Sequence, residues 1–582
     1  MKWIHEAKRL ELHADRYRLI FAQDRPFVHL EDESGNRLAE LFVLSGIHPL
    51  QGRDDTTTAG NWSVCRSGQE VVFTLQAESS VWKAKTYRFR CRPNRFSYEM
   101  EVEGTGRLAE VNYFGGYCSA NPRWGSGFFW SGTSFKQGFN PEPNMQEENY
   151  FSPDSGSVID LTGVPLPGKG DWFFTPPPFC FAFETEKGWI SMGVEAEPGS
   201  NTYTEYMYHA QQFGFYLSLS YEGYTTVRGS YRLPAIGFDF ADSEYDVLKA
   251  HVDSLAQAGY VTFNPEKEIP SWWVEPIFCG WGSQCYAASL ERGHAPDYCR
   301  QQLYEQFMKT LDQKGLNPGI IVLDDKWQAA YGDNKVDPEK WPDLRGFIDQ
   351  QHQAGKKVLL WLKAWDAEGV PAAECMTNAS GMAMIVDPTN PVFEQRLRQS
   401  VRHMLSADGY DADGFKIDFS ARIASGPGVK KAGEAWGLEL MRLYLGIIYD
   451  EAKKVKPDAL VMTHTPHPYL NDVVDMIRLN DINTGKDVIK AMTHRAKVAS
   501  IACPDAVIDT DNWPMTDSAA WRDYVALQPQ LGVPSLYYVS HIDSTQEELT
   551  EDDYALIRQT WEQARRQKPA GKRSAKDVQK DG

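Results

Sequence analysis

The sequence has few cysteines and none of the motifs that cysteines form in metal or disulfide sites. Nine cysteines occur in 582 residues, an odd number, and no CxxC pair is present. They stand at Cys65, Cys91, Cys118, Cys180, Cys279, Cys285, Cys299, Cys375 and Cys503. These spacings argue against a disulfide framework and a zinc ribbon, so we expect reduced, mostly buried thiols.

An excess of basic residues is also lacking. Lysine and arginine number 60 against 79 aspartates and glutamates, which gives a formal net charge of −19. A protein that binds nucleic acid or an anionic membrane surface needs a basic face. We therefore expect neither nucleic acid nor a membrane as a partner.

Long apolar runs are absent. The first 22 residues contain no apolar core followed by small residues, as a secretion signal would have, and no run approaches the roughly 18 residues of a membrane span. No internal repeat or low-complexity segment is evident. We expect a cytoplasmic protein with an ordinary globular composition of 42% hydrophobic residues, sufficient for two large domains.

Short strands with period-two alternation fill the first part of the chain. Thr86–Arg90 and Phe96–Val102 are examples, and glycine, proline, asparagine and aspartate separate such runs. Many short strands with almost no helical periodicity predict an N-terminal antiparallel β-sandwich over residues 1–264. A helix is expected at Glu244–Ala258, followed by a linker at Pro265–Pro270.

From residue 265 to 566, short apolar runs alternate with amphipathic stretches. The predicted strands are Pro276–Gly280, Gly319–Asp324, Lys357–Leu362, Gly414–Asp418, Ala459–His464, Asp475–Asn480, Ala506–Asp509 and Ser535–Val539. Eight strands separated by helices predict a (β/α)8 TIM barrel, and the fold class is therefore multidomain β plus α/β. Residues 567–582 are basic and lack apolar periodicity, so we expect a disordered tail there.

In such a barrel the active site lies where the strands end, and the second strand ends in a notable group. Asp324 and Asp325 follow its apolar run, and Trp327 comes directly after them. Carboxylates accept hydrogen bonds from sugar hydroxyls, and an indole can cover the apolar face of a sugar. An N-cap and a surface turn are the structural alternative.

The fourth strand carries a lysine and an aspartate two residues apart, Lys416 and Asp418. Side chains with this spacing point to the same side of a strand, here into the barrel. Such a lysine would keep the carboxylate ionised, as a nucleophile requires. A purely structural ion pair is the alternative.

The other predicted strand ends add an aromatic, carboxylate-rich rim with few histidines. The third strand contributes Trp361 and Lys363, the fifth ends at His464, the sixth brings Arg478 and Asp481, and the seventh offers Asp509 and Asp511. Taken singly, each residue could equally serve as a cap or a salt-bridge partner. Together they favour carbohydrate chemistry.

Several of these motifs resemble known glycosidases. The stretches Val322–Trp327, Val336–Pro342 and Ala354–Trp361 look like the β2–β3 region of α-galactosidases of the melibiase type. The runs Ile385–Pro391 and Asp413–Asp418 are similar to the bacterial members and to the related α-glucosidase and α-xylosidase superfamily. The resemblance is to glycoside hydrolase clan D and spans roughly residues 270–545.

This resemblance implies roles for individual residues. The aspartate of the Lys-x-Asp motif is the nucleophile in these families, here Asp418, and Lys416 would contact the substrate. The aspartate pair after the second strand, Asp324 and Asp325, is similar to the pair that holds the O4 and O6 hydroxyls of galactose.

Two residues compete for the acid/base role. The α-galactosidase pattern, an arginine followed closely by Asp-Ile, favours Asp481 with Arg478, whereas the α-glucosidase pattern nominates Asp511. The acid should keep its proton near neutral pH, so we expect Arg478 to point at substrate or at another carboxylate rather than at Asp481.

The resemblance implies a retaining, exo-acting α-glycoside hydrolase that uses an α-linked oligosaccharide or glycoside and needs no cofactor or metal. An α-glucosidase- or α-xylosidase-like hydrolase is one alternative, and a non-catalytic carbohydrate-binding relic is another. Two further hypotheses are a metal-dependent hydrolase that uses His464 and His467 and a Schiff-base aldolase that uses Lys416. The sugar and the oligomeric state stay open.

Overall fold

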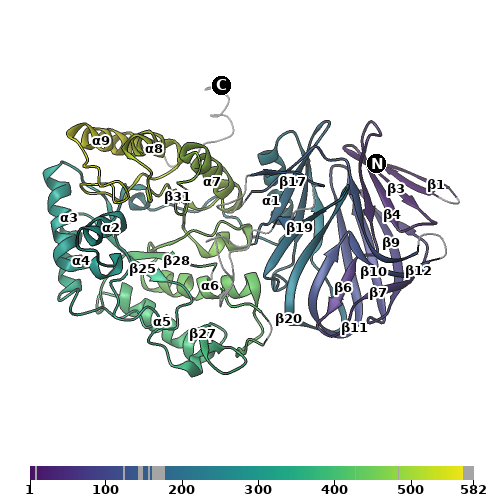
Figure 1. Cartoon of the computed structure of the whole chain (residues 1–582), viewed down its shortest axis with the longest axis horizontal. Helices are drawn as coiled ribbons and strands as arrows, with labels where there is room; N and C mark the ends of the chain where they lie inside the picture. Colours follow the sequence, from purple (N-terminus) through teal and green to yellow (C-terminus); the bar gives the residue numbers. More distant parts are fainter. Residues whose placement is uncertain are drawn as a thin grey trace.

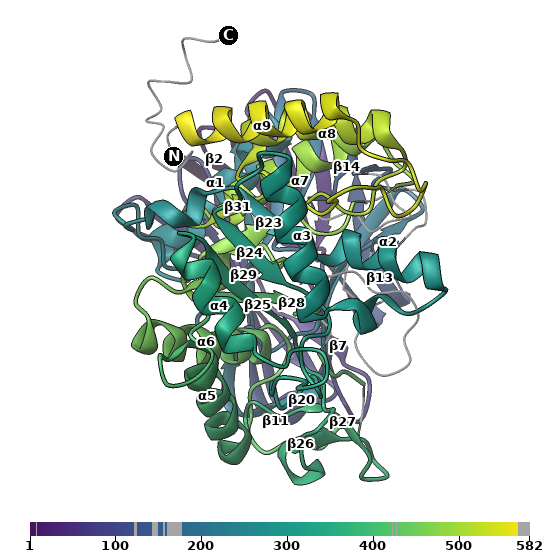
Figure 2. The same cartoon turned by 90° about the vertical axis from the view of Figure 1, so that its left-hand side faces the viewer.

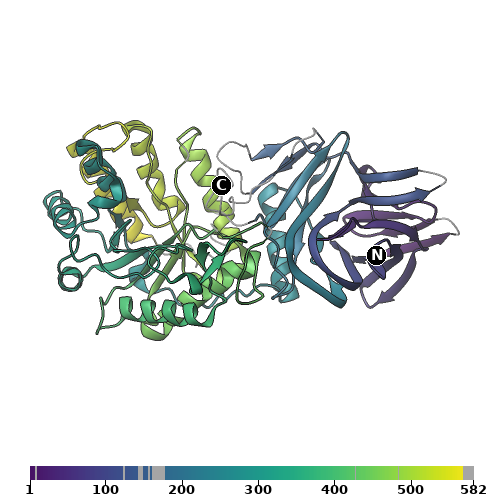
Figure 3. The same ribbon diagram turned by 60° about the horizontal axis from the view of Figure 1, so that its bottom comes forward.

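The computed structural model describes residues 1–6, 9–121, 125–141, 149–154, 158–159, 177–421, 423–426, 428–482 and 484–567. A β-rich part and a part with both helices and strands lie side by side along the longest axis of the molecule (Figure 1, Figure 3). Among the described helices, none combines the length and low charge needed to cross a lipid bilayer.

The N-terminal part is a network of 22 strands within the described residues, nearly all antiparallel. Its strands are β1 (Lys2–Glu6), β2 (Arg9–His13), β3 (Tyr17–Ala22), β4 (Phe27–Asp32), β5 (Arg37–Phe42), β6 (Gly46–Pro49), β7 (Asp55–Ala59), β8 (Ser63–Ser67), β9 (Glu70–Ser79), β10 (Ala84–Cys91), β11 (Phe96–Tyr113), β12 (Gly115–Asn121), β13 (Gly125–Thr133), β14 (Gln137–Phe139), β15 (Tyr150–Phe151), β16 (Val158–Ile159), β17 (Cys180–Thr185), β18 (Gly188–Glu195), β19 (Glu205–Gln211), β20 (Gly214–Arg232), β21 (Ala235–Phe238) and β22 (Phe240–Ala241). The large antiparallel sheet expected from the sequence is therefore present.

Period-two alternation explains why these residues form strands. In β10 every second residue is buried, and Tyr87 and Phe89 enter the core while Arg88 and Arg90 face outward. Opposing aromatic side chains fill this core, as where Phe96 stacks on Phe238.

The C-terminal part contains eight parallel strands in the order β31, β30, β29, β28, β25, β24, β23, β32. Their bounds are β23 (Ile277–Cys279), β24 (Ile320–Leu323), β25 (Lys357–Lys363), β28 (Gly414–Asp418), β29 (Leu460–Thr463), β30 (Met476–Arg478), β31 (Val507–Asp509) and β32 (Ser535–Leu536). A parallel bridge between Asp509 and Val533 joins the two ends of this order. Every strand overlaps its predicted run, and the arrangement is that of the expected barrel.

Helices cover the outside of this closed sheet (Figure 2). They are α2 (Trp281–Glu291), α3 (Gln301–Gln313), α4 (Leu344–Gln353), α5 (Pro391–Leu405), α6 (Gly437–Val455), α7 (Val488–Ala502), α8 (Ser518–Leu531) and α9 (Glu551–Arg566). A small hairpin, β26 (Cys375–Thr377) and β27 (Ala383–Val386), precedes α5. In α3 the buried residues Tyr304, Phe307, Met308 and Leu311 repeat with helical spacing and fix the inward face.

Two crossovers differ from the expected pattern of one helix per strand. Within the described residues, α2 and α3 both follow β23, whereas β29 and β30 are joined by a short 3-10 segment, Pro468–Val473, instead of an α-helix. Proline at the start and the short segment length suit a 3-10 turn better than a full helix. At these two crossovers the described chain departs from the regular alternation of strand and helix expected from the sequence.

Helix α1 (Glu244–Ala258) has the predicted bounds and connects the two parts. Ser243 caps its first turn by accepting a hydrogen bond from Asp246 N, and Gly259 ends it in the left-handed conformation. The expected tail lies outside the described residues from residue 568 onward.

The two parts meet closely at the start of α6. Tyr224 of the β-rich part stacks on Trp436 with ring centroids 3.9 Å apart. Gly437 has a φ of +57°, and a side chain there would collide with the carbonyl oxygen of Tyr203. Glu439 accepts a hydrogen bond from the backbone N–H of Asn201 at 3.0 Å. This contact fixes the β-rich part against the barrel.

Candidate active site

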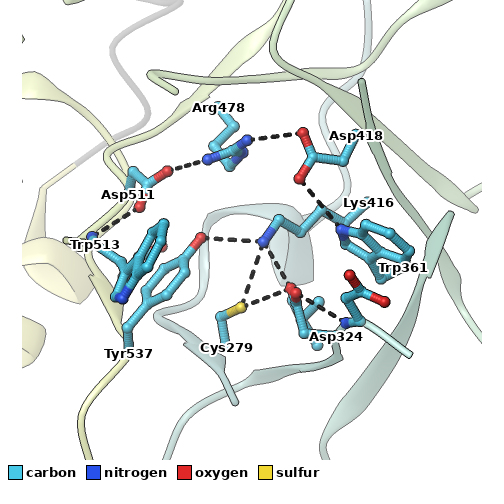
Figure 4. A network of polar contacts seen from close by, with 12 residues as sticks. Cys279, Asp324, Trp361, Lys416, Asp418, Arg478, Asp511, Trp513 and Tyr537 are labelled. Atoms are coloured by element: carbon cyan, nitrogen blue, oxygen red, sulfur yellow. Dashed lines mark hydrogen bonds and ion pairs between the residues drawn. The ribbon is translucent and has the colours of Figure 1, made fainter. Parts of the chain in front are cut away.

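Polar side chains converge at the carboxyl ends of the barrel strands. Asp324 directly follows β24, Asp418 and Arg478 are the last residues of β28 and β30, and Tyr537 directly follows β32. These are alternate strands of the barrel, whose inward side chains share a layer. Figure 4 shows them surrounding one small volume.

Asp418 is held by several donors at once. Its carboxylate accepts hydrogen bonds from Arg478 Nη2 at 3.2 Å and from Trp361 Nε1 at 3.3 Å. His464 Nε2 lies 3.3 Å from the same carboxylate, and the N–H of Phe419 donates at 2.9 Å. Burial alone would raise the pKa of Asp418, but the charges of these neighbours and of Lys416 outweigh it and lower the pKa to about 2.

Asp481 shares Arg478 with Asp418 but has a different electrostatic setting. Arg478 Nη1 contacts its carboxylate at 2.8 Å, and the side chain is 37% exposed. Desolvation within the site, together with repulsion from Asp418 and Asp511, outweighs the attraction of Arg478 and raises the pKa of Asp481 to about 6. The direct contact contradicts the expectation that Arg478 would avoid Asp481, because one guanidinium serves three carboxylates.

Asp511 is the third carboxylate on Arg478, and its side chain is 0% exposed. Its other oxygen accepts a hydrogen bond from the N–H of Trp513 at 3.0 Å. Burial raises the pKa of Asp511, and the charge of Arg478 counteracts this. Its oxygens are thus committed to protein donors.

Lys416 reaches across the barrel to Asp324, with Nζ 2.7 Å from Oδ2. Its other neighbours are the Tyr537 hydroxyl at 3.3 Å and Cys279 Sγ at 3.5 Å. Lys416 therefore pairs directly with Asp324 rather than with Asp418, because the side chains of alternate strands meet inside the barrel, and its charge still lowers the pKa of Asp418 as expected. Both Lys416 and Asp324 are nearly fully buried and form the floor of the site.

Asp325 belongs to a separate group at the edge of the site. The hydroxyl of Tyr331 donates to Asp325 Oδ1 at 2.8 Å. The ammonium groups of Lys326 and Lys363 each lie 4.1 Å from the centroid of the Tyr331 ring. Burial, with repulsion from nearby carboxylates, raises the pKa of Asp325 to about 7 despite the Tyr331 hydrogen bond. Lys363 also pairs with Asp366 at 2.8 Å.

Trp327 and Trp361, which were expected to bind the sugar, are both buried. Trp327 is 0% exposed, its Nε1 donates to the carbonyl oxygen of Trp361 at 2.8 Å, and its ring packs against Tyr410. Trp361 is also buried and orients Asp418 through its Nε1. Trp327 is therefore a core residue, because the chain after β24 folds its side chain back into the interior.

His464 and Asp509 are also too buried to meet a substrate. The ring of His464 lies between Ser420 and Asp418. Asp509 accepts hydrogen bonds from the hydroxyl of Ser535 and the N–H of Asp511. Their expected contact with substrate is corrected to support of neighbouring site residues.

Sequence reasoning missed Tyr331 and Tyr537. Tyr537 directly follows the eighth strand, so the strand-end rule applied to the other strands would have found it. Tyr331 lies in the loop after β24, six residues beyond Asp325, and nothing in the local pattern indicates that the loop turns back.

Two other groups of described residues have a geometry that a metal ion could use. They are Glu195, Asp239 and His251, and Asp349, His352 and Asp411. Arg95 pairs with both carboxylates of the first group, and Arg345 pairs with both of the second. In each group a guanidinium of the protein itself already pairs with both carboxylates.

Comparisons with known proteins agree with the fold. Residues 290–444 match the sequence model of the glycosyl hydrolases family 31 TIM-barrel domain. No curated protein matches the chain in sequence.

Several solved structures are similar to the whole chain. A family 31 sulfoquinovosidase from E. rectale has a TM-score of 0.57 and 13% identity, over 97% of this chain and 82% of that one. A family 31 dextranase from Flavobacterium johnsoniae has a TM-score of 0.52 and 13% identity, over 97% and 68%. An α-galactosidase from Thermus thermophilus has a TM-score of 0.50 and 13% identity, over 86% and 94%. At this identity the likeness concerns the fold alone.

Proposed function

We propose that this chain is a retaining, exo-acting α-glycoside hydrolase, most similar in activity to an α-galactosidase, with Asp418 as nucleophile and Asp481 as acid/base. The observation that carries the proposal is one guanidinium, Arg478, contacting both carboxylates. A retaining enzyme needs its two carboxyl groups close together, about 5–5.5 Å apart, with opposite protonation states. The pKa values of about 2 for Asp418 and about 6 for Asp481 meet the second requirement.

The reaction would proceed by two displacements. Asp418 attacks the anomeric carbon as the bond to the glycosidic oxygen breaks, and Asp481 gives its proton to that oxygen. Asp481 then removes a proton from water as the water oxygen attacks the anomeric carbon, and the bond between that carbon and Asp418 breaks. No cofactor takes part in either step.

Exposure supports Asp481 over Asp511 as the acid. A general acid must come within hydrogen-bond distance of the leaving oxygen, and the side chain of Asp511 is 0% exposed while that of Asp481 is 37% exposed. Asp481 also shares Arg478 with Asp418, so it is not remote from the nucleophile. Asp511 is assigned to holding Arg478 in place.

The identity of the sugar is proposed from the group around Asp325 and from the resemblance of the aspartate pair. Asp325, with its Tyr331 contact, supplies a carboxyl that can bind a hydroxyl of the substrate, and Lys363 lies beside the same ring. The resemblance of the aspartate pair favours an α-galactoside. An α-glucosidase- or α-xylosidase-like hydrolase is the alternative, and the similar structure of a family 31 dextranase supports the α-glucoside.

A panel of aryl glycosides tests the proposal. It contains α- and β-linked galactosides, glucosides, xylosides and sulfoquinovosides, and release of the aryl alcohol is measured for the wild type, for Asp418→Ala and for Asp523→Ala, an exposed aspartate on α8. We expect turnover of one α-glycoside that Asp418→Ala loses and Asp523→Ala retains. Binding of a sugar without turnover of any glycoside would instead indicate a carbohydrate-binding relic.

A further inference from the structure

Two indoles and a carboxylate surround the site on one side, and the mechanism above does not use them. Trp281 begins α2 directly after β23, Trp513 lies shortly after β31, and Asp543 follows β32. β32 pairs with β23, and the bridge at Asp509 joins β31 to the residues before β32. The three side chains therefore come from one adjacent sector of the barrel rim.

These side chains contact one another directly. The rings of Trp281 and Trp513 meet edge to face, with centroids 5.8 Å apart and an interplanar angle of 77°. Trp513 Nε1 donates to Asp543 Oδ2 at 3.1 Å. All three residues keep part of their surface accessible. They form a partly open surface rather than a closed core.

Asp543 has hydrogen-bonding capacity to spare. Its Oδ1 is buried, and within the described part of the chain it has no hydrogen-bond partner. Burial also raises the pKa of Asp543, while hydrogen bonds to its carboxyl from Trp513, from Tyr538 and from backbone N–H groups lower it. A buried carboxylate oxygen without a donor is uncommon in proteins, and it indicates a position where a ligand hydroxyl would be bound.

A backbone contact places this surface next to the proposed acid. The N–H of Ile482 donates to the carbonyl oxygen of Trp513 at 2.9 Å, so Trp513 is bonded to the residue that follows Asp481. The N–H of Trp513 also donates to Asp511, which holds Arg478. Trp513 thus lies on the Asp481 side of the site, whereas Asp324 and Lys416 form its floor.

The position of the acid determines what this surface would contact. The proton of Asp481 goes to the oxygen that joins the cleaved sugar to the leaving group, so a surface beside Asp481 faces the leaving group. A sugar offers an apolar face to an indole and a hydroxyl donor to Asp543 Oδ1. An alkyl or lipid leaving group offers no such donor.

We propose that Trp281, Trp513 and Asp543 form a binding site for the leaving-group sugar, so that the substrates of this chain are α-linked disaccharides or oligosaccharides. This inference rests on the proposed function. It adds the chemical class of the leaving group.

Comparing two substrates distinguishes an effect on this binding site from an effect on the reacting centre. One is the α-linked disaccharide whose non-reducing sugar is the one found with the aryl panel, and the other is the α-glycosyl fluoride of that sugar. Fluoride has no sugar ring, and it leaves without a proton from the acid. For Trp513→Ala and Asp543→Ala we expect kcat/KM to fall about 10- to 100-fold on the disaccharide and less than about twofold on the fluoride.

Controls keep the result interpretable. Trp130→Ala, at a 39% exposed tryptophan of the β-rich part, should leave both substrates unaffected. Trp513→Phe keeps a ring but loses the N–H donor, and it should show a smaller loss on the disaccharide than Trp513→Ala. The melting temperature of each variant identifies any that fails to fold.

Three outcomes would overturn the inference. Equal losses on both substrates in folded variants would assign these residues to positioning Asp481 or Asp511. Unchanged kinetics on the disaccharide would remove them from the site. A wild type that cleaves neither the fluoride nor any aryl glycoside would overturn the proposed function itself, and that failure is distinguishable because it precedes any variant.

Discussion

Arg478 is the residue on which the chemistry of this site depends. Its guanidinium contacts Asp418, Asp481 and Asp511, and all three compete for one positive charge. The ionised form of Asp418 gains additional stabilisation from His464, whereas desolvation and repulsion from Asp418 and Asp511 disfavour the ionised form of Asp481. Two carboxyl groups on one arginine therefore have pKa values on opposite sides of the usual aspartate value.

This difference predicts how the rate depends on pH. Asp418 must be ionised, which holds above about pH 2, and Asp481 must be protonated, which holds below about pH 6. We expect kcat/KM on a substrate with a poor leaving group to fall as the pH rises through about 6. Asp481→Ala, assayed on the α-glycosyl fluoride, should lack this fall. A profile that stays flat from pH 5 to about pH 8 would contradict the assignment.

Azide distinguishes the acid/base from the nucleophile. In Asp481→Ala the glycosyl-enzyme forms from an activated aryl glycoside, and azide should attack it from the face opposite Asp418, giving an α-glycosyl azide. In Asp418→Ala azide takes the place of the missing carboxylate and should give the β-glycosyl azide. NMR of the products identifies the anomer. Rescue of Asp511→Ala instead of Asp481→Ala would transfer the acid/base role to Asp511.

At the scale of elements, the turn after β24 directs the side chain of Trp327 into the core. We expect Trp327→Ala to reduce the free energy of unfolding by about 3–5 kcal/mol, because a fully buried indole and its hydrogen bond to Trp361 are lost. Denaturant titration measures this, with Trp130→Ala as a partly exposed control. If Trp327→Ala leaves the stability unchanged but raises KM, Trp327 contacts the sugar after all.

The strands and their ends could be predicted from the sequence. The apolar runs before Asp324, Asp418 and Arg478 mark buried parallel strands, and polar residues at their carboxyl ends gather at one face of a barrel. The direction of a side chain in a turn could not be predicted, which is why Trp327 was misplaced. Partners across the barrel depend on its closure, and so the Lys416–Asp324 pair did not follow from local spacing.

At the scale of the whole molecule, the β-rich part is docked on the barrel through specific contacts. The Tyr224–Trp436 stack is supplemented by hydrogen bonds between the Tyr224 hydroxyl and the backbone of Gly426 and Val429. Gly437 permits the close approach of the two parts. Such contacts couple the two parts more tightly than a flexible linker alone would.

We therefore predict that Tyr224→Ala weakens this coupling. The variant should lose about 1–3 kcal/mol of stability, because a ring stack and its hydrogen bonds disappear. Calorimetry should show one unfolding transition for the wild type and broader or separate transitions for the variant. A variant that unfolds in one transition at the temperature of the wild type would mean that the stack does not couple the parts.

The central claim is that Asp418 forms a covalent bond with the substrate. The most direct measurement uses a 5-fluoro glycosyl fluoride of the sugar that the panel identifies, because its glycosyl-enzyme hydrolyses slowly. Intact-protein mass spectrometry and peptide mapping then locate the adduct. We predict one added glycosyl mass on the peptide that contains Asp418, and none on the Asp418→Ala variant. An adduct on another carboxylate, or turnover of the normal substrate without any trapped adduct, would contradict the account.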